Sequence, residues 1–327
     1  MTRSVVAFVG SLVADALAMP VHWYYDREAL RRDYGLVEGY QAPRNPHPGS
    51  ILWRSRYEAP NEACDILREQ AQWWGQRDIH YHQFLLAGEN TLNFRLATAL
   101  FQQVQEAGGY DPARWLDHYV TLMLQPGWHR DTYVEEYHRG FFQRYARGTP
   151  PLDCGISDEH IGGLAQVPAL VAALTGEPHE QVRRVVQSHV ALTHRHEGVL
   201  KAADTLVRLL LALEAGVPLR EAIRTEAADW LSPTKAEKWQ SQPDEVIVGQ
   251  RYSTACYIAE AMPASLYLAW KYHDDVMAGI IANTMVGGDN CHRGAVVGSL
   301  LAAANGVPEP WRQGLQARMV PQATVGA

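Results

Sequence analysis

The sequence predicts an all-α fold, built as one compact domain of many helices. Apolar residues recur at three- and four-residue spacing through most of the 327 residues, which is the pattern of amphipathic helices. A glycine that ends one such segment is repeatedly followed by a proline that begins the next, as in Gly216-Val217-Pro218, so the connections are short. Val246–Val248 has a weak strand pattern. Because no linker interrupts this organisation, we expect a single domain over residues 1–327.

The helices can be placed in chain order. A first buried helix is expected over Gly10–Met19. Residues 41–60 are polar and rich in proline, which predicts a long surface loop. Seven later helices complete the prediction: Phe94–Glu106, Pro112–Leu124, Gly163–Thr175, Val182–Val190, Glu197–Glu214, Arg220–Leu231 and a small-residue helix over Gly294–Ala304.

Composition limits the classes of function. With 47% hydrophobic and 20% charged residues the chain resembles an ordinary soluble globular protein, and a net charge of −7 without a basic patch argues against a nucleic-acid partner. No run reaches the ~18 consecutive apolar residues of a membrane span, so we expect no membrane partner. The four cysteines form no CxxC pair, and we expect a reducing, cytoplasmic location.

The amino-terminal segment has a second interpretation. Arg3, the apolar run Val5–Val13 and the small residues Ala16-Leu17-Ala18 resemble a secretory signal peptide with its cleavage site. Asp15 lies within that cleavage region, which favours a helix of the folded protein instead.

The segment Gly287-Gly288-Asp289-Asn290-Cys291-His292 gathers reactive side chains where a turn enters the small-residue helix. Two glycines permit a turn that Cβ atoms would forbid. A helix amino terminus carries free N–H groups and partial positive charge, which suit an anion or a carboxylate that holds a metal. The alternative is that Asp289 merely caps a buried helix.

Two other segments carry acids in structured surroundings. Asp15 lies on an otherwise apolar helix, and we expect it to cap or brace another helix because a buried carboxylate needs partners. Glu89, Asn90 and Thr91 place an acid, an amide and a hydroxyl just ahead of the helix expected from Phe94.

In order along the chain, these segments resemble the motifs of the ADP-ribosylglycohydrolase family, which includes dinitrogenase reductase-activating glycohydrolases and a jellyfish lens crystallin. The motifs are D-A-L-x-x-P at Asp15–Pro20, the turn at Gly88–Thr91, T-H-x-H at Thr193–His196 and the G-G-D before the last small-residue helix. The resemblance spans Gly10 to Gly306. It implies a single all-α domain whose cleft holds two divalent cations, usually magnesium or manganese, and hydrolysis of the glycosidic bond to ADP-ribose.

The match is incomplete at the site itself. His22 stands where the family has a glutamate for metal binding and catalysis, and Glu89-Asn90-Thr91 is similar to part of Thr-Asp-Asp-Thr. Asp289 is kept, whereas cysteine and histidine replace the second aspartate and the threonine of the last motif. The resemblance therefore implies Glu89 and Asp289 as catalytic or metal-holding groups, with Cys291 and His292 beside them. It implies His22, Asn90, Thr91, Asp158 and Asn290 as contacts to substrate.

Ligand chemistry leaves the cofactor open. Two magnesium ions need several hard carboxylate oxygens, and Asp289 with Glu89 supplies too few. Histidine and cysteine in place of acids favour one transition-metal ion, or no metal at all.

A metal-free site would have its own chemistry. Cys291 beside His292 and Arg293 at a helix amino terminus has a setting that lowers a thiol pKa, so it is a candidate nucleophile, although simple burial is the alternative. Glu89 and Asp289 could instead act as the two carboxyl groups of a glycoside hydrolysis. Asp158 lies where the family has a loop near the ribose, and helix capping is its alternative role.

The sequence thus favours an enzyme that cleaves an N- or O-glycosidic bond to a ribosyl or ADP-ribosyl-like substrate, a small molecule or an ADP-ribosylated partner. Two alternatives remain. One is a catalytically silent ligand-binding or structural protein of the family, and the other is a different hydrolysis that uses Cys291 or a single transition metal.

Overall fold

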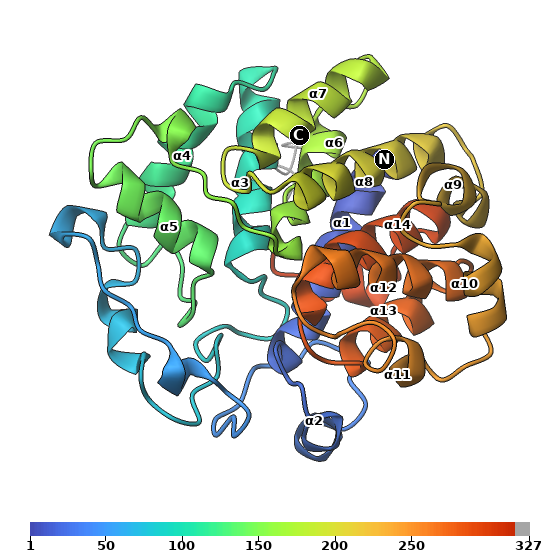
Figure 1. Ribbon diagram of the computed structural model, residues 1–327, viewed down its shortest axis with the longest axis horizontal. Coiled ribbons are helices and arrows are strands. Elements are labelled where there is room, and N and C mark those ends of the chain that lie inside the picture. Colours follow the sequence, from blue (N-terminus) through green and yellow to red (C-terminus); the bar gives the residue numbers. More distant parts are fainter. Residues whose placement is uncertain (318–327) are drawn as a thin grey trace, which may run out of the picture.

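A computed structural model describes residues 1–317, and its helices form a single compact domain (Figure 1). Within these residues no strand forms, and only isolated β-bridges occur. The predicted all-α fold is therefore confirmed. The α-helices are α1 (Arg3–Ala18), α2 (Arg27–Tyr34), α3 (Leu92–Ala107), α4 (Pro112–Leu124), α5 (Glu136–Tyr145), α6 (Val167–Ala173), α7 (His179–Val190), α8 (Glu197–Glu214), α9 (Leu219–Glu226), α10 (Pro233–Trp239), α11 (Asp244–Ile247), α12 (Ile258–Lys271), α13 (Val276–Met285), α14 (Asn290–Asn305) and α15 (Glu309–Gly314).

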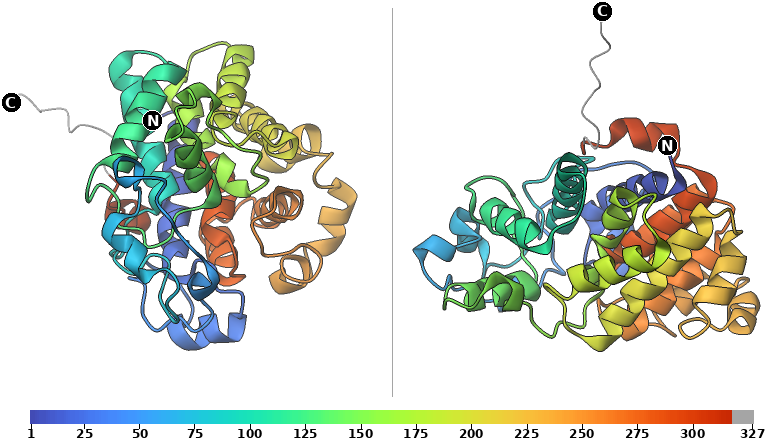
Figure 2. Two further views of the ribbon diagram at one scale, coloured as in Figure 1. Left: turned by 60° about the vertical axis from the view of Figure 1, so that its left-hand side comes forward. Right: turned by 90° about the horizontal axis from the view of Figure 1, so that it is seen from above.

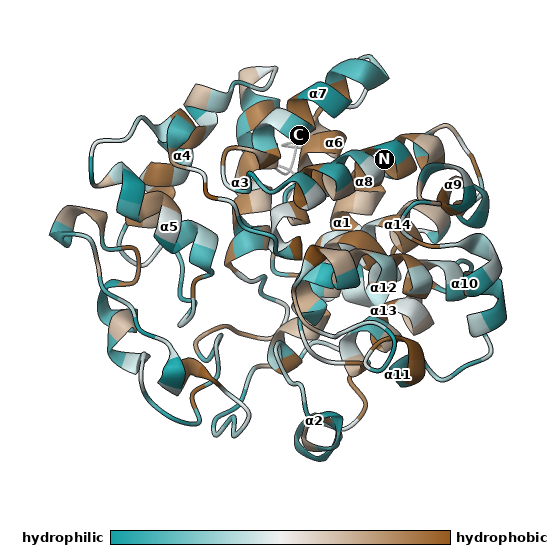
Figure 3. Ribbon diagram, in the orientation of Figure 1, coloured by the Kyte–Doolittle hydropathy of each residue, from teal (hydrophilic) through white to brown (hydrophobic). Residues whose placement is uncertain are grey.

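The central pair of helices is α1 and α14, the first and nearly the last along the chain. Their small residues let the two backbones approach closely, because a Cβ atom built on Gly10 would lie 2.4 Å from the carbonyl oxygen of Gly298. Both helices are buried almost throughout and apolar in Figure 3. Helices α6, α8, α12 and α13 pack around this pair. A loop-rich part with α4 and α5 lies beside the helical cluster in both views of Figure 2.

Each predicted helix overlaps an observed one, although several bounds differ: Gly10–Met19 is part of the longer α1, and the helix predicted to Leu231 ends at Glu226 in α9. The prediction over Gly163–Thr175 is divided into the 3-10 helix η6 (Ile161–Leu164) and α6, because Pro168 lies in the first turn of α6. The weak strand pattern at Val246–Val248 forms no strand in the described structure. Residues up to Ile247 belong to α11, and Val248 makes only an isolated bridge to Tyr252.

The segment expected as a surface loop, residues 41–60, is irregular apart from the short 3-10 helix η2 (Leu52–Arg54). It is not wholly on the surface, since His47, Ser50 and Leu52 are buried. The irregular chain continues to Thr91 with two more short 3-10 helices, η3 (Glu62–Cys64) and η4 (Arg68–Trp73). This long segment therefore covers the helical cluster and brings His80 and His82 into the interior.

The amino-terminal helix has a property that was not expected from its sequence. By length and composition alone, Arg3–Val21 is long and apolar enough to cross a membrane, because its small residues count toward the mean hydropathy. In the fold, 89% of that stretch is buried inside the protein, where α1 packs on α14. The apolar residues of α1 therefore form part of the protein core.

The histidine of α7 predicts how stability depends on pH. His189 is buried between Tyr110 and Gln166, and burial lowers its pKa to about 3. A neutral folded histidine contributes stability above its unfolded pKa of about 6.5 and loses it as the pH falls. At pH 5 the loss from this one group should be about 2 kcal/mol.

We therefore expect the H189Q variant to lose less stability than the parent when urea unfolding at pH 7 is compared with unfolding at pH 5. Parallel losses in the two proteins would contradict the assignment of His189 as a buried neutral group. H179Q, at the exposed first residue of the same helix, is the matched control and should behave like the parent.

Candidate functional site

The Gly287-Gly288 turn, directly before α14, contacts the segment that follows α1. Both glycines have left-handed φ values, +70° and +65°, and a Cβ atom on either would lie about 2.2–2.3 Å from a backbone oxygen of Tyr24 or Thr254. The Gly288 N–H donates to the Tyr24 carbonyl at 2.7 Å, and the Trp23 N–H donates to the Gly288 carbonyl at 2.8 Å. This pairing holds the segment after α1 against the start of α14, so that His22 meets Asp289.

Arg293 supports the same turn from inside the protein. Its guanidinium is fully buried and donates to the carbonyl oxygens of Gly287 at 2.5 Å and Thr254 at 3.0 Å. A further contact joins its Nε to the Asn283 side-chain oxygen at 3.3 Å. Burial lowers the pKa of this arginine to about 10, which still leaves it charged at neutral pH. Arg293 therefore braces the turn and does not line the pocket.

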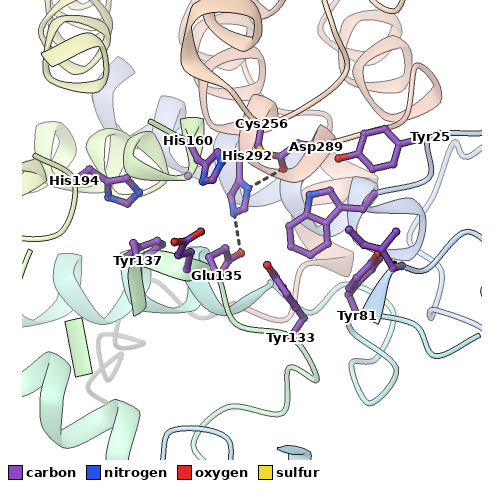
Figure 4. Close-up of a pocket in the computed structure, with 14 residues that line it drawn as sticks. Tyr25, Tyr81, Tyr133, Glu135, Tyr137, His160, His194, Cys256, Asp289 and His292 are labelled. Atoms are coloured by element: carbon purple, nitrogen blue, oxygen red, sulfur yellow. Dashed lines mark hydrogen bonds and ion pairs between the residues drawn. The ribbon is translucent and has the colours of Figure 1, made fainter. Parts of the chain in front are cut away.

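A pocket of about 150 Å³, partly open to solvent, lies over the start of α14 (Figure 4). This volume is smaller than the roughly 300–1,000 Å³ of most small-molecule sites, so a ligand of that size would extend through the open side. Its walls combine aromatic rings with a few ionisable groups. The rings are Trp23, Tyr25, Tyr81, Tyr133 and Tyr137, and the ionisable groups that converge in Figure 4 are Glu135, His160, His194, Asp289 and His292.

Asp289 stands between two imidazole rings at the base of the pocket. Its Oδ1 lies 2.8 Å from His22 Nε2 and 2.8 Å from His292 Nδ1, whereas its buried Oδ2 has no hydrogen-bond partner among residues 1–317. Burial alone would raise the pKa of Asp289, but the two histidines lower it, so the group is a carboxylate. Burial lowers the pKa of His22 to about 3. The three side chains are close enough together to hold one metal ion.

A chain of buried side chains continues behind His22. His22 Nδ1 lies 2.8 Å from His82 Nε2, and His82 Nδ1 lies 2.6 Å from Asp131 Oδ1. The two rings are nearly parallel, and all three residues are buried. His22 is therefore oriented from both of its nitrogens.

His292 is likewise held on both sides. Its Nε2 lies 3.4 Å from Glu135 Oε1 and 2.8 Å from Asn93 Nδ2. Burial would lower the pKa of His292, but Asp289 and Glu135 raise it well above the usual value. Burial would raise the pKa of Glu135, and His292 instead lowers it to about 2. Glu135, directly before α5, faces Asp289 across one imidazole ring.

A second acid and histidine pair lies at the edge of the pocket. Asp158 Oδ1 is 2.8 Å from His160 Nδ1 and 4.0 Å from His194 Nε2. Burial would raise the pKa of Asp158, but His160 lowers it to about 2, and the hydrogen bond to Asp158 raises the pKa of His160 to about 11. Asp158 does not line the pocket itself, but it contacts His160 and His194, which do.

The structure places the other predicted site residues elsewhere. Glu89 forms an ion pair with Arg130 and accepts from the Leu86 N–H at 2.7 Å, and it lines a different cavity from Asp289. Asn90 and Thr91 both donate to the Asp15 carboxylate, at 2.8 Å and 2.7 Å. The expectation that Asp15 braces another helix is confirmed, since these bonds hold the start of α3. Neither Asn90 nor Thr91 lines the pocket around Asp289.

Cys291 and Asn290 lie beneath the pocket. The Cys291 thiol packs with Ala18, Met19 and Leu85 and lies 3.6 Å from the Asp15 carbonyl oxygen. Burial raises the pKa of this thiol, so the expected lowering by the helix terminus is wrong, because desolvation outweighs it. Asn290 donates to the Thr284 carbonyl at 2.9 Å and holds the turn.

Sequence reasoning missed Glu135, Asn93 and Asp131. Glu135 occupies the N-cap position of α5, and Asn93 lies in the first turn of α3. An acid or amide at a helix start was the available signal, but many such residues only cap helices.

The site does not fit a pair of magnesium ions. Two hard cations need several convergent carboxylates, and the Thr-Asp-Asp-Thr counterpart here is turned toward Asp15 and Arg130. The groups that meet at Asp289 are two imidazoles.

Comparisons with known proteins agree with this fold. The chain is 23% identical over 322 residues to Crystallin J1A of Tripedalia cystophora, covering 94% of this chain and 90% of the crystallin. A solved structure described as an ADP-ribosylglycohydrolase-related protein complex has the same fold, with a TM-score of 0.65 and 20% identity over 96% of this chain and 92% of that one. The ADP-ribosylglycohydrolase family matches residues 1–325, and this chain belongs to that family.

Proposed function

We propose that the protein hydrolyses a glycosidic bond to a ribosyl or ADP-ribosyl-like group in the pocket over α14, with Glu135 as the acid/base residue. The observation that carries this proposal is the position of Glu135, whose side chain is 16% exposed and faces the pocket opposite the buried Asp289–His292 pair. Family membership supports a hydrolase of this bond type.

In the proposed step water adds to the anomeric carbon as the glycosidic bond breaks, and the proton that the water loses passes through an acid/base group to the leaving nitrogen or oxygen. Glu135 is ionised, and its Oε2, buried 3.8 Å from His138 Nε2, makes no hydrogen bond within residues 1–317, so this oxygen would accept that proton once water reaches it. Glu135 and Asp289 stand on opposite sides of His292, so the imidazole ring separates the two carboxylates and only Glu135 is placed to meet water in the pocket. His292 then orients Glu135 and keeps it charged.

The aromatic walls suit a substrate with a flat base. Trp23 lies edge-on to Tyr81 and to Tyr133, with ring centroids 4.8 Å and 5.1 Å apart, so these rings form a corner. Trp23 also adopts a left-handed φ of 61°, which is rare outside glycine and gathers at functional sites. The substrate under this proposal is a small ribosyl compound or an ADP-ribosylated partner met in the cytoplasm.

The E135Q variant tests the proposal. We expect it to lose at least about 100-fold in turnover of ADP-ribosyl-arginine or an O-linked ADP-riboside, because glutamine cannot accept the proton. Released ADP-ribose is measured by chromatography, with helical circular dichroism as the check on folding.

Two further variants make the result specific. E177Q changes an exposed glutamate beyond α6 and should keep parental turnover. E89Q changes the acid that the sequence motif favours. Turnover lost in E89Q and kept in E135Q would overturn the role of Glu135.

A structural role without turnover is the second candidate, and the similarity to Crystallin J1A favours it. Absence of turnover for both N-linked and O-linked substrates, in protein that is folded and supplied with divalent metals, would support this candidate.

A further inference from the structure

We propose that His22, His292 and Asp289 bind one first-row transition-metal ion, of which Zn²⁺ is the first to test. This inference goes beyond the proposed hydrolysis, and it would hold for a protein without turnover. It also differs from the pair of magnesium or manganese ions that the family resemblance implies.

The spacing of the three side chains fits a single ion. Their ligand atoms all lie within 4.8 Å of one another, and Asp289 Oδ1 is 2.8 Å from a nitrogen of each ring. Ligands about 2.1 Å from one ion are themselves roughly 3.0–3.4 Å apart, so small side-chain rotations suffice. In the described part of the chain the buried Oδ2 of Asp289 has no hydrogen-bond partner, and it supplies a second oxygen at the same position.

The hydrogen-bonding groups behind His22 accommodate an ion at His22 Nε2 with each ring neutral. Without an ion, His22 Nε2 must donate to the Asp289 carboxylate, and the neutral ring then accepts from His82 Nε2. A neutral His82 would be left with a lone pair 2.6 Å from Asp131 Oδ1, which is also an acceptor, so the contact then requires hydrogen on both nitrogens of His82.

An ion at His22 Nε2 removes this requirement. His22 Nδ1–H then donates to His82 Nε2, and His82 Nδ1–H donates to Asp131, so every contact joins one donor to one acceptor. A carboxylate behind a ligating histidine is the usual outer support of protein metal sites, and here it acts through a second histidine.

His292 has a comparable support. When its Nδ1 faces the ion, its Nε2–H points to Glu135 Oε1 at 3.4 Å. The Asn93 side-chain amide lies 2.8 Å from the same nitrogen. When the amide is turned so that its oxygen and nitrogen exchange places, the oxygen can accept from His292 Nε2–H.

The donor set selects the kind of ion. Two imidazoles with one carboxylate suit zinc, iron or manganese and are poor ligands for magnesium, which prefers oxygen. Because Asp289 and His292 line the pocket, the remaining coordination positions of the ion face the substrate space. Cys291 is excluded as a ligand, since its sulfur packs against Ala18, Met19 and Leu85.

The test uses the full chain without a histidine tag, stripped with a chelator and titrated calorimetrically with Zn²⁺, Mn²⁺, Fe²⁺ and Mg²⁺ in the absence of substrate. We expect one equivalent of a transition-metal ion and no stoichiometric Mg²⁺. H22Q and D289N should lose at least about 100-fold in affinity, and H82Q about 10- to 100-fold, as a positioning residue. H47Q is the matched control, because His47 is buried nearby, is not one of the three ligands and has two unpartnered nitrogens.

X-ray absorption of the zinc-loaded parent protein keeps the test independent of how the variants fold. Two imidazole ligands with no sulfur at about 2.3 Å are expected. Failure of all three transition ions to bind stoichiometrically would overturn the proposal. So would two equivalents of Mg²⁺, a zinc–sulfur distance, or unchanged affinity in folded H22Q and D289N. Because metal content is measured without substrate, this result is separate from the outcome for hydrolysis.

Discussion

Replacing Gly298 by alanine is expected to destabilise the protein by about 3 kcal/mol, although the same change in an ordinary helix would stabilise it by about 1 kcal/mol. The added Cβ would lie 2.4 Å from the Gly10 carbonyl oxygen and 2.6 Å from the Ala14 Cβ atom. Neither neighbour is a flexible side-chain end, so α1 and α14 would have to move apart. Because this pair lies at the centre of the core, the cost spreads to the helices packed around it.

Urea unfolding at neutral pH measures this effect, and G10A should behave similarly because its Cβ would lie 2.2 Å from that of Ala302. G39A is the control, since no heavy atom of the described residues lies within 4 Å of a Cβ atom added at Gly39. A G298A protein as stable as G39A would show that the two helices are not in close contact.

The R293M variant is expected to lose about 3 kcal/mol or more. Methionine fills much of the same space, but it leaves the Gly287 carbonyl oxygen and the buried Asn283 side-chain oxygen without the donor that Arg293 supplies, whereas the Thr254 carbonyl keeps the Asp289 N–H. An unsatisfied buried polar group costs about 1–3 kcal/mol, and two or more are created together. The variant should also lose affinity for any ligand of the pocket, because the turn carries Asp289.

R293K separates the charge from the geometry. Lysine keeps the positive charge, but its single ammonium group cannot replace the planar guanidinium that contacts Gly287, Thr254 and Asn283 together. We therefore expect the stability of R293K to lie between those of R293M and the parent. The measurement is again the free energy of unfolding in urea. Equal stability of R293M and the parent would mean that the turn holds without Arg293.

The fold could be predicted from sequence because its signals are local. Apolar periodicity and the residues at helix ends placed α4 and α8 with their observed bounds, Pro112–Leu124 and Glu197–Glu214. The role of Asp15 as a brace was also predictable, since a buried carboxylate requires partners. The irregular path of residues 35–91 was not predictable in this way, because its burial depends on contacts with distant helices.

The site was predictable only in part. Asp289, His22 and His292 were recognised, and the structure brings them together. Glu89 was favoured by its position in a motif, but its Arg130 partner lies 41 residues away, and no local pattern reveals that pairing. Glu135 was missed for the same reason, since only the folded chain places it against His292.

The packing of α1 on α14 also sets the order of events as the protein is made. His22 and Asp289 are 267 residues apart in the chain. At about 5–20 residues per second, a ribosome needs roughly 15–50 s to pass from one to the other. Throughout that time the apolar face of α1 lacks its main partner, so the newly made chain needs protection from aggregation until α14 emerges.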